Sequence, residues 1–409
     1  MLKVNTIHYG WIIAATGFMV LFSCLGLARY AYTMLLPGMQ AGLGLAYDRM
    51  GFIGTANFVG YLVSVVVAPA LIRRYHPRSV ITAGLLLIGV CMLGMSRCHG
   101  FFTAAFLYTL VGLGGGFANI PMMALVTYWF RSEQRGKAAG LVIGGNGAAI
   151  IFAGFLIPLL NRIYRADGWR SGWLVLGLIS LAVAACAASL LRNHPSELGL
   201  EPVGRPLPVS TGQLVPHERR GDGGTLLRLG LLYLVFGATF MVYGTFIVTT
   251  MVQEYGFSEL KAGLYWSWVG FFSLFSGVGF GALSDTIGRK YGLMLVFAVQ
   301  TAAYLLAGLK LGSAGLVVSI ILYGSAVFAI PAIMAAAIGD YLGLSRAATA
   351  FATVTIFFAV GQTIGPAGAG LIARTHGSFT TAYLLASLLT ALAAVFAALL
   401  PHPAQAEAE

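Results

Sequence analysis

Charged side chains are scarce in this chain. Only 9% of its 409 residues are charged, whereas soluble domains carry about 25%. With 58% hydrophobic residues, the chain lacks the polar surface that a soluble fold of this size needs, so the composition excludes a soluble enzyme and a disordered chain. The four cysteines, Cys24, Cys91, Cys98 and Cys186, lie in or beside apolar segments. They imply no disulfide scaffold, and we expect small hydrophobic packing from them.

Acidic residues are rarer still, at 13 against 24 lysines and arginines, which gives a net charge of +11. The basic residues are scattered between apolar segments and form no stripe or arm, so we expect no nucleic-acid partner. No acidic residue or histidine falls in the middle of an apolar run. The sequence also lacks an H-E-x-x-H motif, a Cys/His ligand cluster and paired intramembrane carboxylates. We therefore expect no enzyme, no metal and no cofactor.

Long apolar runs dominate what is present, and about 20 apolar residues suffice for one membrane-spanning helix. The sequence predicts an all-α membrane protein with twelve transmembrane helices, over 10–38, 49–74, 79–97, 101–130, 135–161, 169–191, 227–253, 260–284, 290–309, 314–341, 346–373 and 378–400. The first run is too long for a signal-peptide core, so we expect it to be retained as a span.

The longest polar stretch, residues 192–226, is rich in proline and divides these spans into six and six. It predicts an N-terminal bundle over 1–191, a cytoplasmic linker over 192–226 and a C-terminal bundle over 227–409. Most lysines and arginines fall on one side of the membrane, although Arg162, Arg165 and Arg170 cluster on the other. The positive-inside rule therefore predicts a multi-pass protein of the plasma membrane, as in the bacterial inner membrane, with both termini cytoplasmic.

Two features recur along the chain at nearly one offset. The loop that begins at residue 71 and ends at Arg78 matches the loop that begins at residue 283 and ends at Lys290, at an offset of 212. The stretch 117–121 matches 327–331 at an offset of 210. Together they indicate that the second six spans repeat the first. Two like-oriented halves with a site near the membrane midplane form an architecture for alternating access.

Residues 281–290, GALSDTIGRK, resemble the loop pattern G-x-L-x-D-x-x-G-[RK]-[RK] of the major facilitator superfamily. Residues 8–11, HYGW, and the stretch 128–147, with YWF, RGKAAGL and GGNG, resemble its monocarboxylate porter and oxalate/formate antiporter branch. The resemblance implies two pseudo-symmetric six-helix bundles and a secondary transporter that needs one twelve-span unit. The chain departs from the family at Arg73 and His76, where the first copy of the loop has Asp and Gly, and at Tyr108, where many proton-coupled members have Arg.

Arg29 is the charged residue nearest the middle of a span. Span 1 centres near residue 24, so at about 1.5 Å per residue Arg29 lies about 7 to 8 Å from the midplane. An arginine at that depth costs at least about 2.5 kcal/mol unless it faces a wet cavity. We therefore expect Arg29 to bind a substrate carboxylate through its fork of N–H donors. Snorkelling to the headgroups and a structural pairing with tyrosines are the alternatives.

Other polar and aromatic side chains fall at similar depths, and a polar group buried in hydrocarbon needs a partner. Bonding between helices alone would explain each of them. The functional interpretation is that they line one cavity with Arg29, the aromatic rings providing apolar walls and the amides fixing polar ends. These candidates are Tyr32, Asn57, Tyr61, Asn119, Asn146, Tyr243, Trp268, Tyr323 and Gln362.

The loop motif suggests gating rather than chemistry. By analogy with the family, Asp285 would meet the start of span 5 near Arg135, where an anion at a helix N-terminus is favourable. Arg73 or Arg74 would form a charge-swapped pair with Asp340. Arg289, in the same loop motif, completes the gating set. A solvated loop is the alternative for these charges.

The sequence as a whole favours alternating-access transport of a small organic monocarboxylate such as lactate or pyruvate, with proton symport, exchange and facilitated diffusion all open. Efflux of amphipathic compounds is the alternative within transport, and Arg29 argues against it. A membrane enzyme lacks its catalytic set, and a non-transporting receptor lacks large sensor loops.

Overall fold

The structure is a computed structural model, and it describes residues 8–205, 223–342 and 347–401. Within those ranges the regular structure is helical, with one isolated bridge between Phe130 and Val203. The predicted all-α fold is therefore confirmed. Apolar runs of this length favour helices because a helix satisfies every interior backbone group within its own segment.

The N half contains the elements that precede residue 191. Its first span is built from three helical segments, one of which is a π-helix, η1. The elements are α1 (Tyr9–Leu21), η1 (Phe22–Tyr30), α2 (Ala31–Leu43), α3 (Tyr47–Met95), α4 (Phe101–Trp129), α5 (Ser132–Tyr164), the short η2 (Arg165–Asp167) and α6 (Gly168–Leu190).

The C half follows a short 3-10 turn, η3 (Pro195–Leu198), in the linker. The tenth span of the chain, which belongs to this half, is interrupted between α10 and α11. The elements are α7 (Gly223–Gln253), α8 (Glu259–Ile287), α9 (Arg289–Gly308), α10 (Gly312–Ala326), α11 (Ala329–Leu342), α12 (Ala347–His376) and α13 (Thr380–Ala397).

Ten helical stretches among the described residues are long and apolar enough to cross a membrane, and two of them each contain two crossings. The stretch from Glu133 to Leu190 joins α5 and α6, and α3 folds back on itself at His76. The count of twelve spans agrees with the sequence prediction.

The loop motif has the same backbone conformation in both halves. His76 has a φ of 63° and Gly288 a φ of 93°, and these residues stand 212 positions apart, at the glycine of the motif. A positive φ suits glycine and strains a residue with a Cβ atom. The backbone therefore repeats across the halves even where His76 replaces the glycine.

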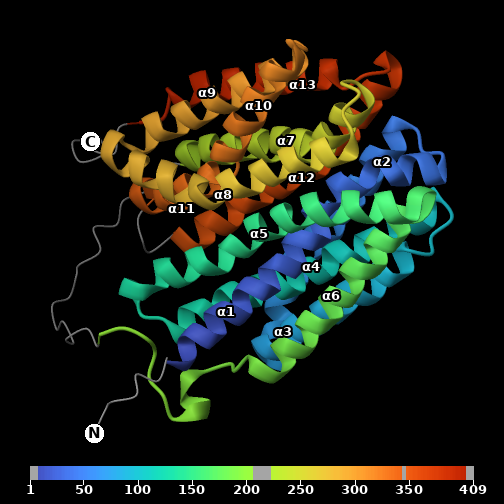
Figure 1. The fold of residues 1–409 in the computed structure, drawn as a ribbon. Coiled ribbons are helices and arrows are strands. Elements are labelled where there is room, and N and C mark those ends of the chain that lie inside the picture. The colour runs from blue at the N-terminus through green and yellow to red at the C-terminus, as the bar shows by residue number, and fades with distance from the viewer. Residues whose placement is uncertain (1–7, 206–222, 343–346, 402–409) are drawn as a thin grey trace, which may run out of the picture.

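The halves form two bundles, α1–α6 and α7–α13, which lie one above the other in Figure 1. We call the end where α1 begins and α6 ends the proximal end, since Tyr9 there donates to the Leu190 carbonyl. The distal end is where α2 and α7 end. The long seams between the halves are α3 against α12 and α5 against α8.

Glycines let these seams close. A Cβ on Gly51 would lie 2.3 Å from the Pro366 carbonyl oxygen, and one on Gly263 would lie 2.2 Å from the Gly154 carbonyl oxygen. Side chains at these positions would push the backbones apart, so the seams require small residues.

The first part of the predicted linker, residues 192–205, contacts the N half. Val203 pairs with Phe130 in the isolated bridge, and Arg131 forms an ion pair of 2.6 Å with Glu201. Residues 192–205 therefore pack on the N half, and α7 begins at Gly223, before the predicted boundary at 226. The rest of the predicted linker, 206–222, lies outside the described residues.

Candidate functional site

The first span changes its winding where the candidate anchor sits. Over Phe22–Tyr30 it forms a π-helix, and the Ala31 N–H donates to the carbonyl of Gly26, five residues back. π-Helical segments are rare and often occur at functional sites. The apolar sequence of this span gives no signal for this change of winding.

Arg29, in this π-helix, stands between two aromatic rings of α3. Its guanidinium carbon lies 4.7 Å from the ring centroid of Phe58 and 4.7 Å from that of Tyr61. Its Nε is buried without a hydrogen-bond partner. Among the described residues, no carboxylate forms an ion pair with it. The aromatic faces stabilise a cation in this position but leave its N–H donors free for an anion.

A small cavity adjoins Arg29 at the contact between the halves. It has a volume of about 10 Å³, which is on the order of the space for one water. Both halves line it, with α7 supplying the C-half wall. The lining residues are Arg29, Tyr30, Tyr32, Thr33, Gly54, Asn57, Phe58, Tyr108, Met241, Gly244 and Thr245.

Four predicted residues gather around Arg29 in the N half. Tyr32 and Asn57 line the cavity, and Tyr61 stacks on the guanidinium. Asn119 donates from Nδ2 to the Tyr61 hydroxyl at 3.0 Å and so orients that ring. Asn57 donates to the carbonyl of Tyr108 at 3.2 Å.

Tyr243 and Tyr323 lie elsewhere, inside the C half. Their rings stack with centroids 4.1 Å apart, and both are fully buried. The Tyr243 hydroxyl bonds to Ser319 Oγ at 2.8 Å, and the Tyr323 hydroxyl donates to the Phe240 carbonyl at 3.0 Å. They form a layer behind the cavity wall rather than its surface, so we correct the prediction that they line it.

The three remaining candidates are also absent from the cavity lining. Trp268 packs against Tyr265, with ring centroids 5.2 Å apart. Gln362 is buried on α12, and Asn146 is buried on α5 with its Oδ1 unpartnered. The depth of a residue along its span does not say which way the helix turns its side chain.

Sequence reasoning missed the aromatic and apolar part of the site. Phe58 was not predicted, although it stands three residues before Tyr61 and therefore on the same helix face. Tyr30 contacts Phe240 and Phe328 of the C half, with ring centroids 6.5 Å and 6.1 Å apart. These rings bring an apolar surface of the C half against Tyr30, the residue after Arg29.

The predicted gating charges of the C half pair with one another in this conformation. Arg289 forms ion pairs with Asp285 and, at 2.7 Å, with Asp340. Arg135 donates to the carbonyls of Thr127 and Phe130 in its own half. Between described residues, Asp285 forms no hydrogen bond or ion pair with the start of α5, and neither Arg73 nor Arg74 forms an ion pair with Asp340. The cross-half gating contacts therefore remain a prediction for another conformation.

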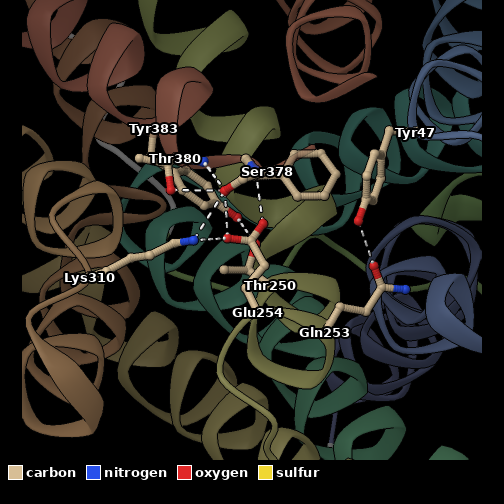
Figure 2. Close-up of polar contacts among 9 residues, drawn as sticks. Tyr47, Thr250, Gln253, Glu254, Lys310, Ser378, Thr380 and Tyr383 are labelled. Carbon is tan, nitrogen blue, oxygen red and sulfur yellow. Dashed lines mark hydrogen bonds and ion pairs between the residues drawn. The ribbon is translucent and has the colours of Figure 1, made fainter. Parts of the chain in front are cut away.

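Contacts between the halves concentrate at the distal end. Asp48 forms an ion pair with Arg374 at 2.7 Å, and Asn161 donates to Glu259 at 2.7 Å. Figure 2 shows the Tyr47 hydroxyl bonded to Gln253 Oε1, at 3.2 Å. At the proximal end no hydrogen bond or ion pair joins the halves between described residues. The two bundles are thus fastened distally.

The stretches that suggested the monocarboxylate branch meet at the proximal end. Tyr9 packs against Trp129 with ring centroids 5.7 Å apart, and Trp11 packs against Phe130 at 5.3 Å. The His8 side chain caps α1 by accepting from the Gly10 N–H. In this structure, these motifs hold the start of α1 to the end of α4.

A family model described as uncharacterised MFS-type transporter YbfB matches residues 21–400. The chain belongs to the major facilitator superfamily. Similar members include the hexuronate transporter of Bacillus subtilis (strain 168), 24% identical over 91% of this chain and 89% of that one. Human monocarboxylate transporter 2 is 23% identical over 95% of this chain and 84% of that one.

Solved superfamily structures share the fold. A bacterial homologue of the human lysosomal transporter Spinster, in an inward-facing and unoccupied conformation, aligns with a TM-score of 0.74. The alignment covers 96% of this chain and 95% of that one at 14% identity. The resemblance to the superfamily and its fold of two six-helix bundles is therefore confirmed, and this superfamily member is a multi-pass membrane transporter.

Proposed function

We propose that this protein is a secondary transporter that carries a small organic monocarboxylate, of the size of lactate or pyruvate, by alternating access. The observation that carries the proposal is Arg29, whose guanidinium is held between Phe58 and Tyr61 with a buried, unpartnered Nε and no acidic partner among the described residues. Such a charge in a membrane interior is stable when an anion neutralises it.

The surroundings of Arg29 support one carboxylate joined to a compact apolar body. One guanidinium binds one carboxylate in a bidentate fork. The C half lines the cavity with Met241, and its Phe240 and Phe328 rings contact Tyr30 of the cavity lining. The monocarboxylate and hexuronate transporters among the relatives are both named for substrates that carry a carboxylate.

Our proposed orientation places the proximal end in the cytoplasm of a plasma membrane such as the bacterial inner membrane, because most lysines and arginines lie at that end. With this orientation, the distal contacts close the outer side. The cycle would break them, bring the proximal ends together and expose Arg29 to the outside. One chain supplies both halves of the site, so we propose that the monomer transports.

Uptake into proteoliposomes tests the proposal. Purified protein should take up labelled lactate and pyruvate, and Arg29→Gln should reduce uptake at least tenfold, because a charged hydrogen bond contributes about 1.5 to 3 kcal/mol. Arg162→Gln, which removes an exposed cation far from the cavity, should transport normally. Formate, oxalate and a hexuronate complete the panel, and an imposed pH gradient separates proton symport from exchange and from facilitated diffusion. Equal uptake by wild type and Arg29→Gln would refute the anchor.

A further inference from the structure

The two halves place a cation at the same point, the second residue after a long helix at the distal end. Arg97 follows α3, which ends at Met95, and Lys310 follows α9, which ends at Gly308. The two residues are 213 positions apart, close to the offsets of the internal repeat. They are therefore equivalent positions in the two halves, and their surroundings can be compared directly.

Lys310 is neutralised inside its own half. Its Nζ lies 2.8 Å from Glu254 Oε2, as Figure 2 shows, and the Glu254 side chain is only 8% exposed. Glu254 also accepts from Ser378 Oγ at 2.8 Å and from the Phe379 N–H at 2.9 Å. The carboxylate thus accepts from three donors of its own half, the Lys310 ammonium, the Ser378 hydroxyl and the Phe379 N–H.

Arg97 has no such partner. Among the described residues it forms no ion pair, and it is exposed. The positions that correspond to Glu254, at the end of α2, are Ala41 to Gly44, and none is acidic. The nearby Asp167 pairs with Arg170 at 3.5 Å, and Arg170 donates to the carbonyls of Ser96 and Cys98. These hydrogen bonds hold the loop that carries Arg97 in place, but none of them neutralises the Arg97 guanidinium.

An apolar groove runs from Arg97 along the outside of the N half, between α3 and α6. It has a volume of about 390 Å³ and is lined by Leu93, Gly94, Ser96, Arg97, Leu174 and Leu178. Beside this groove α3 and α6 are in contact, since a Cβ on Gly177 would lie 3.0 Å from the Gly89 carbonyl oxygen.

The groove belongs to the surface that faces lipid. Leu174 and Leu178 are 41% and 52% exposed, and Val90 on the adjoining face of α3 is 60% exposed. In a membrane protein such an apolar face is covered by acyl chains. A groove in this face that ends at an unpaired guanidinium matches a lipid in both parts, chain and headgroup.

We propose that this groove is a binding site for an anionic phospholipid of the distal leaflet, with an acyl chain between α3 and α6 and the phosphate on Arg97. The pseudo-equivalent position in the C half offers no such site, because Lys310 already forms an ion pair with Glu254. The proposal is independent of which solute the carrier transports.

Native mass spectrometry of the purified protein tests this site with added phosphatidylglycerol and phosphatidylcholine of identical chains. The wild type should retain phosphatidylglycerol in preference. In Arg97→Gln the preference for phosphatidylglycerol over phosphatidylcholine should fall about fivefold, since a basic residue near the headgroups contributes about that factor. Leu178→Trp, which fills the groove without changing charge, should lower retention of both lipids.

Arg162→Gln is the matched control, because Arg162 is an exposed cation at the same end but outside the groove. Its phosphatidylglycerol preference should equal that of the wild type. Equal loss in Arg97→Gln and Arg162→Gln would show a general charge effect and overturn the site. Displacement of phosphatidylglycerol by millimolar inorganic phosphate would also overturn it, because the pocket would then be a free-anion site.

Discussion

The two halves share a backbone plan, but some of their cations differ in whether they find an acidic partner. In the C half, Lys310 and Arg289 each find carboxylates within the same half. In the N half, Arg29 and Arg97 have no acidic partner among the described residues, one facing the central cavity and the other a lipid-facing groove. A repeated fold therefore supplies equivalent positions, and single substitutions decide whether a cation serves the structure or remains available to an anion.

The buried aromatic residues differ in the same way. Around Arg29 the rings of Phe58 and Tyr61 face the cation and leave its donors free. In the C half, Tyr243, Tyr323 and Tyr383 pack together, and their hydroxyls bond to Ser319, the Phe240 carbonyl and Thr250. These tyrosines satisfy one another and the backbone, so we interpret them as a rigid support for the apolar wall.

The largest expected effect concerns the internally paired charge. Glu254→Ala removes the ion-pair partner of Lys310 and the acceptor of the Phe379 N–H, and should cost about 2 kcal/mol of stability. Arg97→Ala removes a cation that has no acidic partner among the described residues and should change stability by less than about 0.5 kcal/mol. Thermal unfolding in detergent measures both. Equal destabilisation would mean that the two cations are not treated differently.

The aromatic sandwich should affect substrate binding by about tenfold. Tyr61→Ala removes one ring from Arg29, and a desolvated cation–π contact contributes about 1 to 2 kcal/mol. Tyr61→Phe keeps the ring and should reduce affinity much less, and Tyr243→Phe in the C half should leave it unchanged. The KM for uptake gives the comparison. A larger effect from Tyr243→Phe than from Tyr61→Ala would reverse our assignment of the binding face.

Weakening the ion pair that joins the halves at the distal end should raise the population opened at that end by about fivefold. Asp48→Asn weakens the ion pair with Arg374, whose side chain is 64% exposed, so the shift should not exceed about 1 kcal/mol. The population opened at the distal end should rise, as measured by labelling of a cysteine introduced at Thr33 with a membrane-impermeant reagent. Exchanging the two residues, Asp48→Arg with Arg374→Asp, should restore the wild-type labelling rate if the pair acts as a fastening.

The smallest effect is expected at glycines that contact nothing. A Cβ on Gly140 or Gly368 would meet no atom within 4 Å, so alanine there should be neutral or stabilise by up to about 1 kcal/mol. A Cβ on Gly145 or Gly361 would lie within 2.2 Å of a backbone oxygen, so alanine there should destabilise by about 1 to 3 kcal/mol. Unfolding midpoints separate the two classes. Destabilisation at Gly140 would indicate that another conformation uses this position.

Sequence reasoning predicted the spans well because the bilayer imposes one strong rule, that every crossing segment is apolar and helical. It predicted Arg29 because a charge stands out against that background, and it found Tyr32, Asn57, Tyr61 and Asn119 nearby by depth. The same reasoning misplaced Tyr243 and Tyr323, since a residue at the right depth can face the cavity or the inside of its own bundle. Phe58 was missed because an aromatic residue in an apolar span carries no signal of its own.

The sequence by itself determined that the chain is a twelve-span membrane protein with one charge deep in its first span, because apolar length and charge cost are local properties of the segment. Only the tertiary structure decided that the first span winds into a π-helix at Arg29, that Phe58 and Tyr61 enclose this residue, and that Lys310 is neutralised while Arg97 is not. These outcomes depend on which helices touch and how each is rotated, and such contacts join residues far apart in the chain.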